Sequence, residues 1–215
     1  MVREFLFGQL SFFGLLSGLL ALVTALTIHE FAHAYSAHRM GDDTAKRLGR
    51  VSLNPMAHYD LLGTTLILLG GFGWGKPVPV DPSRLRNQRF GMLWVSLWGP
   101  LSNILTATAL ALMIRWTPFA DVEALAFLNS YVVWTMNLSL MLAFFNLLPI
   151  WPLDGSKVLS GLLPPKQSMK YERFMMVWGM PLLLCMLFLL PHSLLGTWVG
   201  VPTMWFYRAV GLASF

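Results

Sequence analysis

The sequence predicts an all-α polytopic membrane protein, with a three-helix core, a re-entrant Gly-rich hairpin and one or two C-terminal membrane helices. Two observations carry this prediction. Of the 215 residues, 56% are hydrophobic and only 12% are charged, whereas an ordinary soluble domain has about 25% charged residues. The apolar residues also form long uninterrupted stretches, and about 20 such residues suffice for a helix to cross the hydrocarbon core.

Three stretches without Lys, Arg, Asp or Glu are long enough to form the core helices, Phe5 to Ile28, Met92 to Ile114 and Ala124 to Leu153. The first exceeds the apolar core of an ordinary signal peptide, so we expect it to be retained. Proline and glycine interrupt a fourth stretch, Phe174 to Tyr207, which can form one span plus a second span or an interfacial helix. We expect a single domain over residues 1–215, with its core at about 5–165 and C-terminal helices at about 170–212.

A shorter apolar stretch, Leu61 to Gly75, has four glycines close together at its end. Glycine disfavours a helix, so we predict a re-entrant hairpin or half-span here. Such backbone is tolerated at membrane depth only where protein or a wet cavity covers it. Basic residues flank this stretch on both sides, which also favours a hairpin, because a full crossing would place them on opposite sides of the membrane.

Basic residues cluster in two segments, with eight in residues 39–89 and four in residues 154–173. The connection near residues 115–123 has only Arg115. The positive-inside rule places both basic segments in the cytoplasm, so the first core stretch runs inward, the second returns and the third runs inward again. The net charge of +5 is therefore a topology signal. No basic run is interleaved with aromatic residues, and a nucleic-acid partner is not expected.

The strongest local motif is His29-Glu30-Phe31-Ala32-His33, at the inner end of the first stretch. On a helix, His29 and His33 lie one turn apart on the same face. Two imidazoles at this spacing can share a zinc ion, and the adjacent Glu30 can act as general base on a water activated by that ion. Ionisable groups in a membrane helix are costly and favour a functional interpretation.

A catalytic zinc ion needs a third protein ligand and an open position. Three side chains are candidates. His38 and His58 lie in the loop after the first stretch, and Asp154 lies at the inner end of the third. The predicted topology brings the inner ends of the first and third stretches to the same depth, which favours Asp154. Asp154 could instead cap the helix that follows Pro152.

Together these residues resemble the site-2 protease family, the intramembrane zinc metalloproteases. The first motif is similar to the family's HExxH, and the segment from Asn146 through Pro149 to Leu153-Asp154-Gly155 resembles its NxxPxxxLDG element. Gly99-Pro100-Leu-Ser-Asn103 and the segment from Gly73 to Val80 look familial too. The resemblance covers most of residues 20–165. It implies a compact member without the PDZ or CBS module of larger relatives.

By residue, the resemblance implies that His29, His33 and Asp154 bind one catalytic Zn²⁺ and that Glu30 is the catalytic base. Residues expected to line the site are Asn103, Asn146 and Gly155. Residues of the hairpin expected to bind an unwound substrate as an added strand are Gly71, Phe72, Gly73, Trp74 and Gly75. The implied activity is hydrolysis of peptide bonds in transmembrane proteins or peptides. We expect a multi-pass protein of a prokaryotic cell membrane, with its active site near the cytoplasmic side and a possible regulatory membrane partner.

Other functions fit parts of the pattern. A different membrane metalloprotease would use Glu123 or Glu172 as its third ligand. A zinc- or proton-coupled transporter would use the same side chains to bind a passing ion, although it does not need a glutamate beside paired histidines. A metal-free scaffold would bind membrane helices only. A rhomboid-type serine protease is disfavoured, because Ser156 lacks a following glycine and a histidine to activate it.

Overall fold

The computed structural model describes residues 11–60, 63, 65, 75–116, 125–189 and 192–212. Within these ranges the protein is helical and contains no β-strand, which confirms the predicted fold class. The main helices are α2 (Phe12–Arg39), α5 (Gln88–Trp116), α6 (Ala126–Asn146), α7 (Asp154–Leu162), α8 (Pro165–Phe188) and α9 (His192–Val210). By length and composition α2, α5, α6 and α8 can each cross a membrane. The protein is an integral membrane protein.

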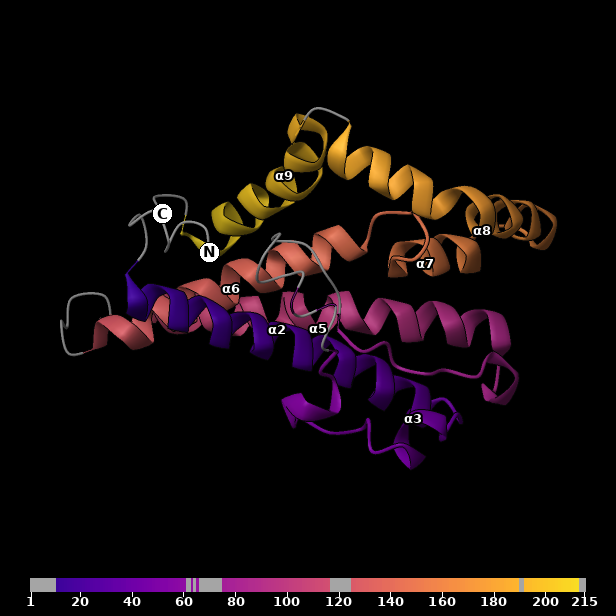
Figure 1. Cartoon of the computed structure of the whole chain (residues 1–215), viewed down its shortest axis with the longest axis horizontal. Helices are drawn as coiled ribbons and strands as arrows, with labels where there is room; N and C mark the ends of the chain where they lie inside the picture. Colours follow the sequence, from indigo (N-terminus) through magenta and orange to yellow (C-terminus); the bar gives the residue numbers. More distant parts are fainter. Residues whose placement is uncertain are drawn as a thin grey trace.

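The helices α2, α5 and α6 pack side by side along most of their length and form the core of the molecule (Figure 1). Small residues face the contacts. Ala21 and Ala25 of α2 are fully buried near Leu138 of α6, and Ala107 and Ala111 of α5 are fully buried in a second cluster. Small side chains let membrane helices approach closely, so that packing replaces the hydrophobic effect as the main source of association.

Two helix boundaries differ from those suggested by the uncharged stretches. The helix α2 continues beyond Ile28 to Arg39, so the HExxH motif lies inside one continuous helix. The third stretch was expected to reach Leu153, but α6 ends at Asn146. Residues 147–153 form turns instead, because Pro149 and Pro152 cannot donate helical hydrogen bonds and restrict the residues before them.

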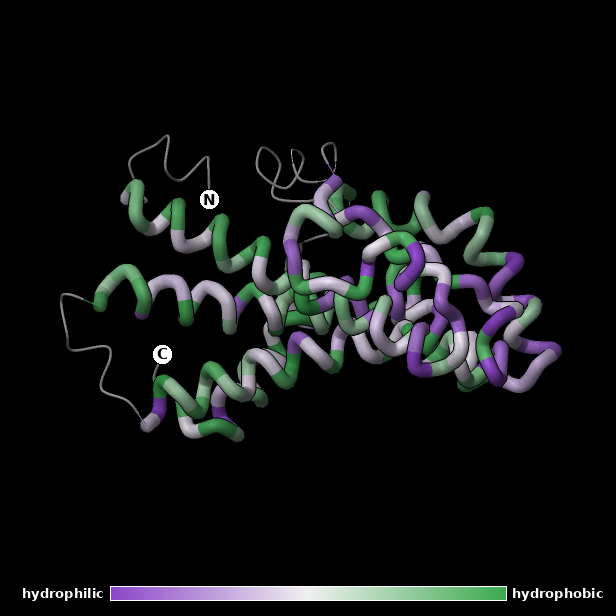
Figure 2. The backbone as a smooth tube through the Cα atoms, turned by 90° about the horizontal axis from the view of Figure 1, so that it is seen from below, coloured by the Kyte–Doolittle hydropathy of each residue, from purple (hydrophilic) through white to green (hydrophobic). Residues whose placement is uncertain are grey.

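The polar segments gather at one end of the bundle, where α2 ends and α5 begins (Figure 2). They include the short helix α3 (Thr44–Arg47) and the 3-10 turns η1 (Pro55–Ala57) and η2 (Pro82–Arg84). The fully buried Asp42 joins them, because its carboxylate accepts hydrogen bonds from the backbone N–H groups of Thr44 and Asp81 at 2.9 and 2.7 Å. We call this end of the molecule the basic end, after the residues of its loops.

The fourth uncharged stretch falls into two helices, α8 and α9, which meet at an angle (Figure 1). The helix α8 packs near α7, and the Tyr171 hydroxyl donates to the Pro149 carbonyl at 2.7 Å. The helix α9 packs against α6. The indole of Trp198 donates to the Phe144 carbonyl at 2.8 Å, and the Tyr207 hydroxyl donates to the Asn137 amide oxygen at 2.6 Å. The C-terminal region therefore contains two helices, of which α8 meets the criteria for a membrane span.

The predicted hairpin, Leu61 to Gly75, lies outside the described residues except for Gly63, Thr65 and Gly75. Gly75 is buried against α2, where an added Cβ would lie 2.9 Å from the Leu26 side chain. The residues that follow, 76–80, have no regular secondary structure. The buried guanidinium of Arg50 holds this segment by donating to the carbonyls of Lys76 and Pro77.

Candidate metal centre

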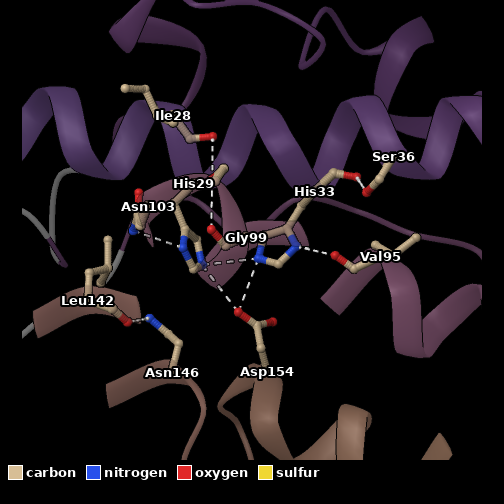
Figure 3. Close-up of polar contacts among 11 residues, drawn as sticks. Ile28, His29, His33, Ser36, Val95, Gly99, Asn103, Leu142, Asn146 and Asp154 are labelled. Atoms are coloured by element: carbon tan, nitrogen blue, oxygen red, sulfur yellow. Dashed lines mark hydrogen bonds and ion pairs between the residues drawn. The ribbon is translucent and has the colours of Figure 1, made fainter. Parts of the chain in front are cut away.

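The helix α2 places His29 and His33 one turn apart, facing the interior of the bundle (Figure 3). Both residues are buried, with exposed fractions of 3% and 8%. Their Nε2 atoms are 3.0 Å apart and point toward the same spot. Buried imidazoles need partners for their nitrogen atoms, and the neighbouring helices supply them.

Asp154 reaches the two imidazoles from the first turn of α7. Its Oδ2 atom lies 3.2 Å from Nε2 of His29 and 3.1 Å from Nε2 of His33. The turns at residues 147–153 connect α6 to α7, which begins at the depth of the two imidazoles. Arg89 of α5 then holds the other end of α7, where its guanidinium donates to the carbonyls of Gly161, at 2.9 Å, and Leu163.

The helix α5 packs against both imidazoles and contacts the outer nitrogen of each. The Val95 carbonyl accepts a hydrogen bond from Nδ1 of His33 at 2.7 Å, and Nδ2 of Asn103 lies 3.3 Å from Nδ1 of His29. Gly99 lies between these two positions. A Cβ at Gly99 would overlap the His33 ring and lie 2.8 Å from Cε1 of His29. The absence of a side chain at Gly99 therefore gives the imidazoles their space.

The three side chains fit a zinc ion. Their ligand atoms are separated by 3.0 to 3.2 Å, and a tetrahedral zinc ion with bonds of about 2.0–2.1 Å requires separations of about 3.3 Å. Two imidazoles and one carboxylate are suitable zinc ligands and leave a fourth position open. Within the described part of the chain, no other group of three or more His, Cys, Asp or Glu residues converges in this way.

The surroundings of Asp154 keep its carboxyl group ionised. Burial by itself raises the pKa of Asp154, but the charge of His33 and the hydrogen bonds from both imidazoles outweigh burial and hold that pKa well below its usual range. An ionised carboxylate is the form that binds a metal ion.

Comparison with known proteins agrees with this chemistry. The sequence model of peptidase family M50 matches residues 113–189. "Putative zinc metalloprotease YwhC" of Bacillus subtilis (strain 168) is 40% identical over 151 residues, which cover 68% of this chain and 68% of YwhC. The chain belongs to peptidase family M50. "Putative zinc metalloprotease Rip2" of Mycolicibacterium smegmatis is 31% identical over 204 residues, which cover 89% of this chain and 73% of Rip2. No solved structure matches the chain.

This M50 peptidase is therefore a zinc metalloprotease of the site-2 protease type, and Zn²⁺ is its cofactor. The predictions of family, enzyme class and cofactor are confirmed. A metal-free scaffold and a serine protease are excluded by the same relatives.

Glu30, the predicted base of the M50 peptidase, is half-buried on α2 beside His29. It lies close enough to His33 and Arg50 to interact with both electrostatically. Burial lowers the pKa of Arg50, and the carboxylate of Glu30 opposes that shift. Arg50 therefore lies near both the predicted base and the segment after Gly75.

The remaining predicted residues lie at different distances from the imidazole pair. Asn146 donates from its side chain to the Leu142 carbonyl of its own helix at 2.9 Å. Gly155 follows Asp154 in α7, and a Cβ there would overlap the carbonyls of Leu147 and Leu148. The missing side chain at Gly155 therefore lets α7 pack closely against the turn that follows α6. Only Asn103, of the three expected lining residues, contacts a histidine of the pair through its side chain.

The rival third ligands are engaged elsewhere. The His38 imidazole pairs with Asp43 at 2.5 Å, and Nε2 of His58 donates to the Ser52 carbonyl at 2.8 Å. Glu172 accepts a hydrogen bond from Ser160 near the start of α8. Glu123 lies outside the described residues.

Three contributors to the site had no assigned role before the fold was known. They are the glycine at 99, the carbonyl of Val95 and the guanidinium of Arg89. The Gly99-Pro100 pair inside an apolar stretch is a signal, because both residues are unfavourable in a helix interior and suggest a packing or functional reason. The contribution of Val95 cannot be predicted from the sequence, because every residue type has a backbone carbonyl.

Proposed function

We propose that this protein hydrolyses peptide bonds within the membrane-spanning segments of other proteins, with one zinc ion held by His29, His33 and Asp154 and with Glu30 as general base. The observation that carries the proposal is the convergence of three buried ligand atoms, from two segments 121 residues or more apart in sequence, within the helical bundle. The zinc metalloprotease relatives support the same chemistry.

The depth of this convergence supports a substrate in the bilayer. Gly99, beneath the imidazoles, is ten residues after Arg89 and sixteen before Arg115. With a rise of 1.5 Å per residue, these intervals correspond to about 15 Å and about 24 Å along α5. The two arginines bracket the apolar length of the helix, so the bond to be cleaved must reach well below the membrane surface.

The chemistry requires a nucleophile, a base and an acid. When bound, the zinc ion supplies Lewis acidity, which activates water and polarises the scissile carbonyl. The carboxylate of Glu30 accepts the proton of the attacking water and later donates a proton to the leaving amine. The buried side chains His29, His33 and Asp154 hold their ligand atoms in place, so that little reorganisation accompanies the reaction.

A membrane helix must unwind before its peptide bonds can react, because its carbonyls are engaged in its own hydrogen bonds. We propose that the segment around residues 71–75 offers an edge to which the unwound substrate adds as a strand. The burial of Gly75 against Leu26, one turn before His29, supports this location, as does the anchoring of Lys76 and Pro77 by Arg50. The roles of Gly71, Phe72, Gly73 and Trp74 stay predictions.

We propose that the basic end faces the cytoplasm. The two segments that hold twelve of the 15 Lys and Arg residues meet there, and an excess of basic residues marks cytoplasmic loops. A membrane-impermeant reagent applied to sealed right-side-out vesicles should leave a cysteine placed at Lys46 unlabelled. Labelling in intact vesicles would overturn this orientation.

The decisive test of the activity replaces Glu30 by glutamine in the purified full chain. A protease whose Glu30 is the base should retain zinc and lose cleavage of a membrane-spanning substrate by about 10²–10⁴-fold. Glu172→Gln is the matched control, because Glu172 is outside the proposed site, and it should retain cleavage. If the protein were a transporter, the wild type and both variants would leave the membrane-spanning substrate uncut. Cleavage by Glu30→Gln at the wild-type rate would refute the role of Glu30.

A further inference from the structure

The helix α5 contacts the outer nitrogen of each imidazole, and the two contacts differ in chemistry. His33 has a carbonyl acceptor, because its Nδ1 atom lies 2.7 Å from the Val95 oxygen. His29 faces the side-chain amide of Asn103, whose Nδ2 atom lies 3.3 Å from Nδ1 of His29 (Figure 3). An acceptor on the outer nitrogen fixes the tautomer and orientation of a metal-binding histidine.

The Asn103 amide has one atom without a partner. The residue is fully buried, and its Oδ1 atom has no hydrogen-bond partner among the described residues. A buried acceptor left unsatisfied costs about 1–3 kcal/mol. A half-rotation of the amide would present this oxygen, in place of the NH₂ group, to Nδ1 of His29.

Zinc coordination supplies that donor. The Nε2 atoms of both histidines point at Oδ2 of Asp154 and are the proposed metal ligands. A neutral imidazole that binds metal through Nε2 carries its proton on Nδ1. Nδ1–H of His29 and the NH₂ group of Asn103 would then be two donors facing each other.

We propose that Asn103 is a positioning residue of the zinc site, whose amide turns by half a rotation so that Oδ1 accepts the Nδ1–H proton of His29 when zinc binds. The turn exchanges the amide oxygen and nitrogen without moving the helix, because the two halves of an amide have nearly the same shape. Val95 and Asn103, two turns apart on α5, then perform the same task for the two histidines. This inference rests on the proposed zinc ligands.

The test measures zinc affinity of the purified full chain by competition with a chromogenic chelator. Asn103→Leu removes the acceptor and should weaken zinc binding by about 10–100-fold. Asn103→Asp keeps an oxygen acceptor with the same shape and should bind within a few-fold of the wild type. Asn137→Leu is the matched control, because Asn137 is an asparagine of the same bundle that bonds Tyr207. It should retain wild-type affinity.

A second measurement needs no variant. In the wild type with ¹⁵N-labelled histidine and bound zinc, the Nδ1 of His29 should carry a proton protected from exchange with solvent. A zinc affinity of Asn103→Leu equal to the wild type, an Asn103→Asp variant as weak as Asn103→Leu, or an unprotonated Nδ1 would each overturn the inference. If the wild type binds no zinc, or His33→Ala binds it equally well, the metal centre proposed above fails and this inference fails with it.

Discussion

Replacement of Gly99 by alanine tests how closely α5 must approach the metal ligands. An added Cβ would lie 2.8 Å from Cε1 of His29 and closer still to the His33 ring, whereas ordinary contacts begin at 3.4 Å. The His29 ring or α5 must therefore move by at least 0.6 Å, the difference between 3.4 and 2.8 Å, and the closer contact with the His33 ring requires a larger shift. Zinc–ligand distances tolerate only about 0.2 Å.

Relief of such an overlap typically costs about 1–3 kcal/mol, and 1.4 kcal/mol corresponds to a factor of ten in affinity. We expect Gly99→Ala to weaken zinc binding by about 5- to 150-fold. The stability of the apoprotein should change less, because alanine favours a helix over glycine by about 1 kcal/mol. This difference separates a damaged metal site from a damaged fold.

The assay is chelator competition for zinc, together with the thermal midpoint of the chelator-treated protein. The matched control is Gly200→Ala in α9, where an added Cβ would meet nothing within 4 Å. It should keep wild-type zinc affinity and gain a little stability. Gly99→Ala with the affinity of the wild type would refute the reasoning, since it would show that the helices separate at no cost to the site.

Two further predictions concern the parts that hold the site in place. Arg89→Met should destabilise the folded protein by about 1.5–3 kcal/mol per lost charged hydrogen bond, because the carbonyls of Gly161 and Leu163 lose their donor. The free energy of unfolding in detergent measures this loss, with Arg86→Met, at an exposed arginine, as the control. Equal stability of the two variants would contradict the prediction. Asp42→Asn should lower the thermal midpoint at pH 7. Burial raises the pKa of Asp42, but the hydrogen bonds from Thr44 and Asp81 outweigh it and hold that pKa below 3.8, so the carboxylate stabilises the fold above pH 3.8 and this contribution is lost as the pH falls further. The difference between wild type and Asp42→Asn should shrink below pH 3.8, and a difference that grows there would contradict the assignment.

The sequence indicated much of the fold because membrane helices and metal motifs have strong local signals. The uncharged stretches located α2, α5 and α6, since a span must be apolar over its whole length. The spacing of His29 and His33 places both on one helix face whatever surrounds them. The convergence of Asp154 with this pair followed from the predicted orientation of the spans and the family resemblance.

Other features depend on contacts between helices, which leave little trace in one sequence. The role of Gly99 is set by the imidazoles across the interface, and the carbonyl of Val95 belongs to the backbone of any residue. Pro149 and Pro152 indicate that α6 ends near Asn146, but the uncharged stretch alone suggested a longer helix. The anchoring of α7 by Arg89 joins residues 72 and 74 positions apart, and a basic residue in a loop indicates topology before it indicates a partner.

X-ray absorption at the zinc edge, recorded on the purified protein, tests the central claim most directly. If His29, His33 and Asp154 hold the ion, the spectrum should show two imidazoles and oxygen ligands at about 2.0–2.2 Å, and the imidazole signal should fall when His29 is replaced by alanine. A stoichiometrically bound zinc ion without imidazole neighbours, or one whose spectrum is the same in His29→Ala, would contradict the account.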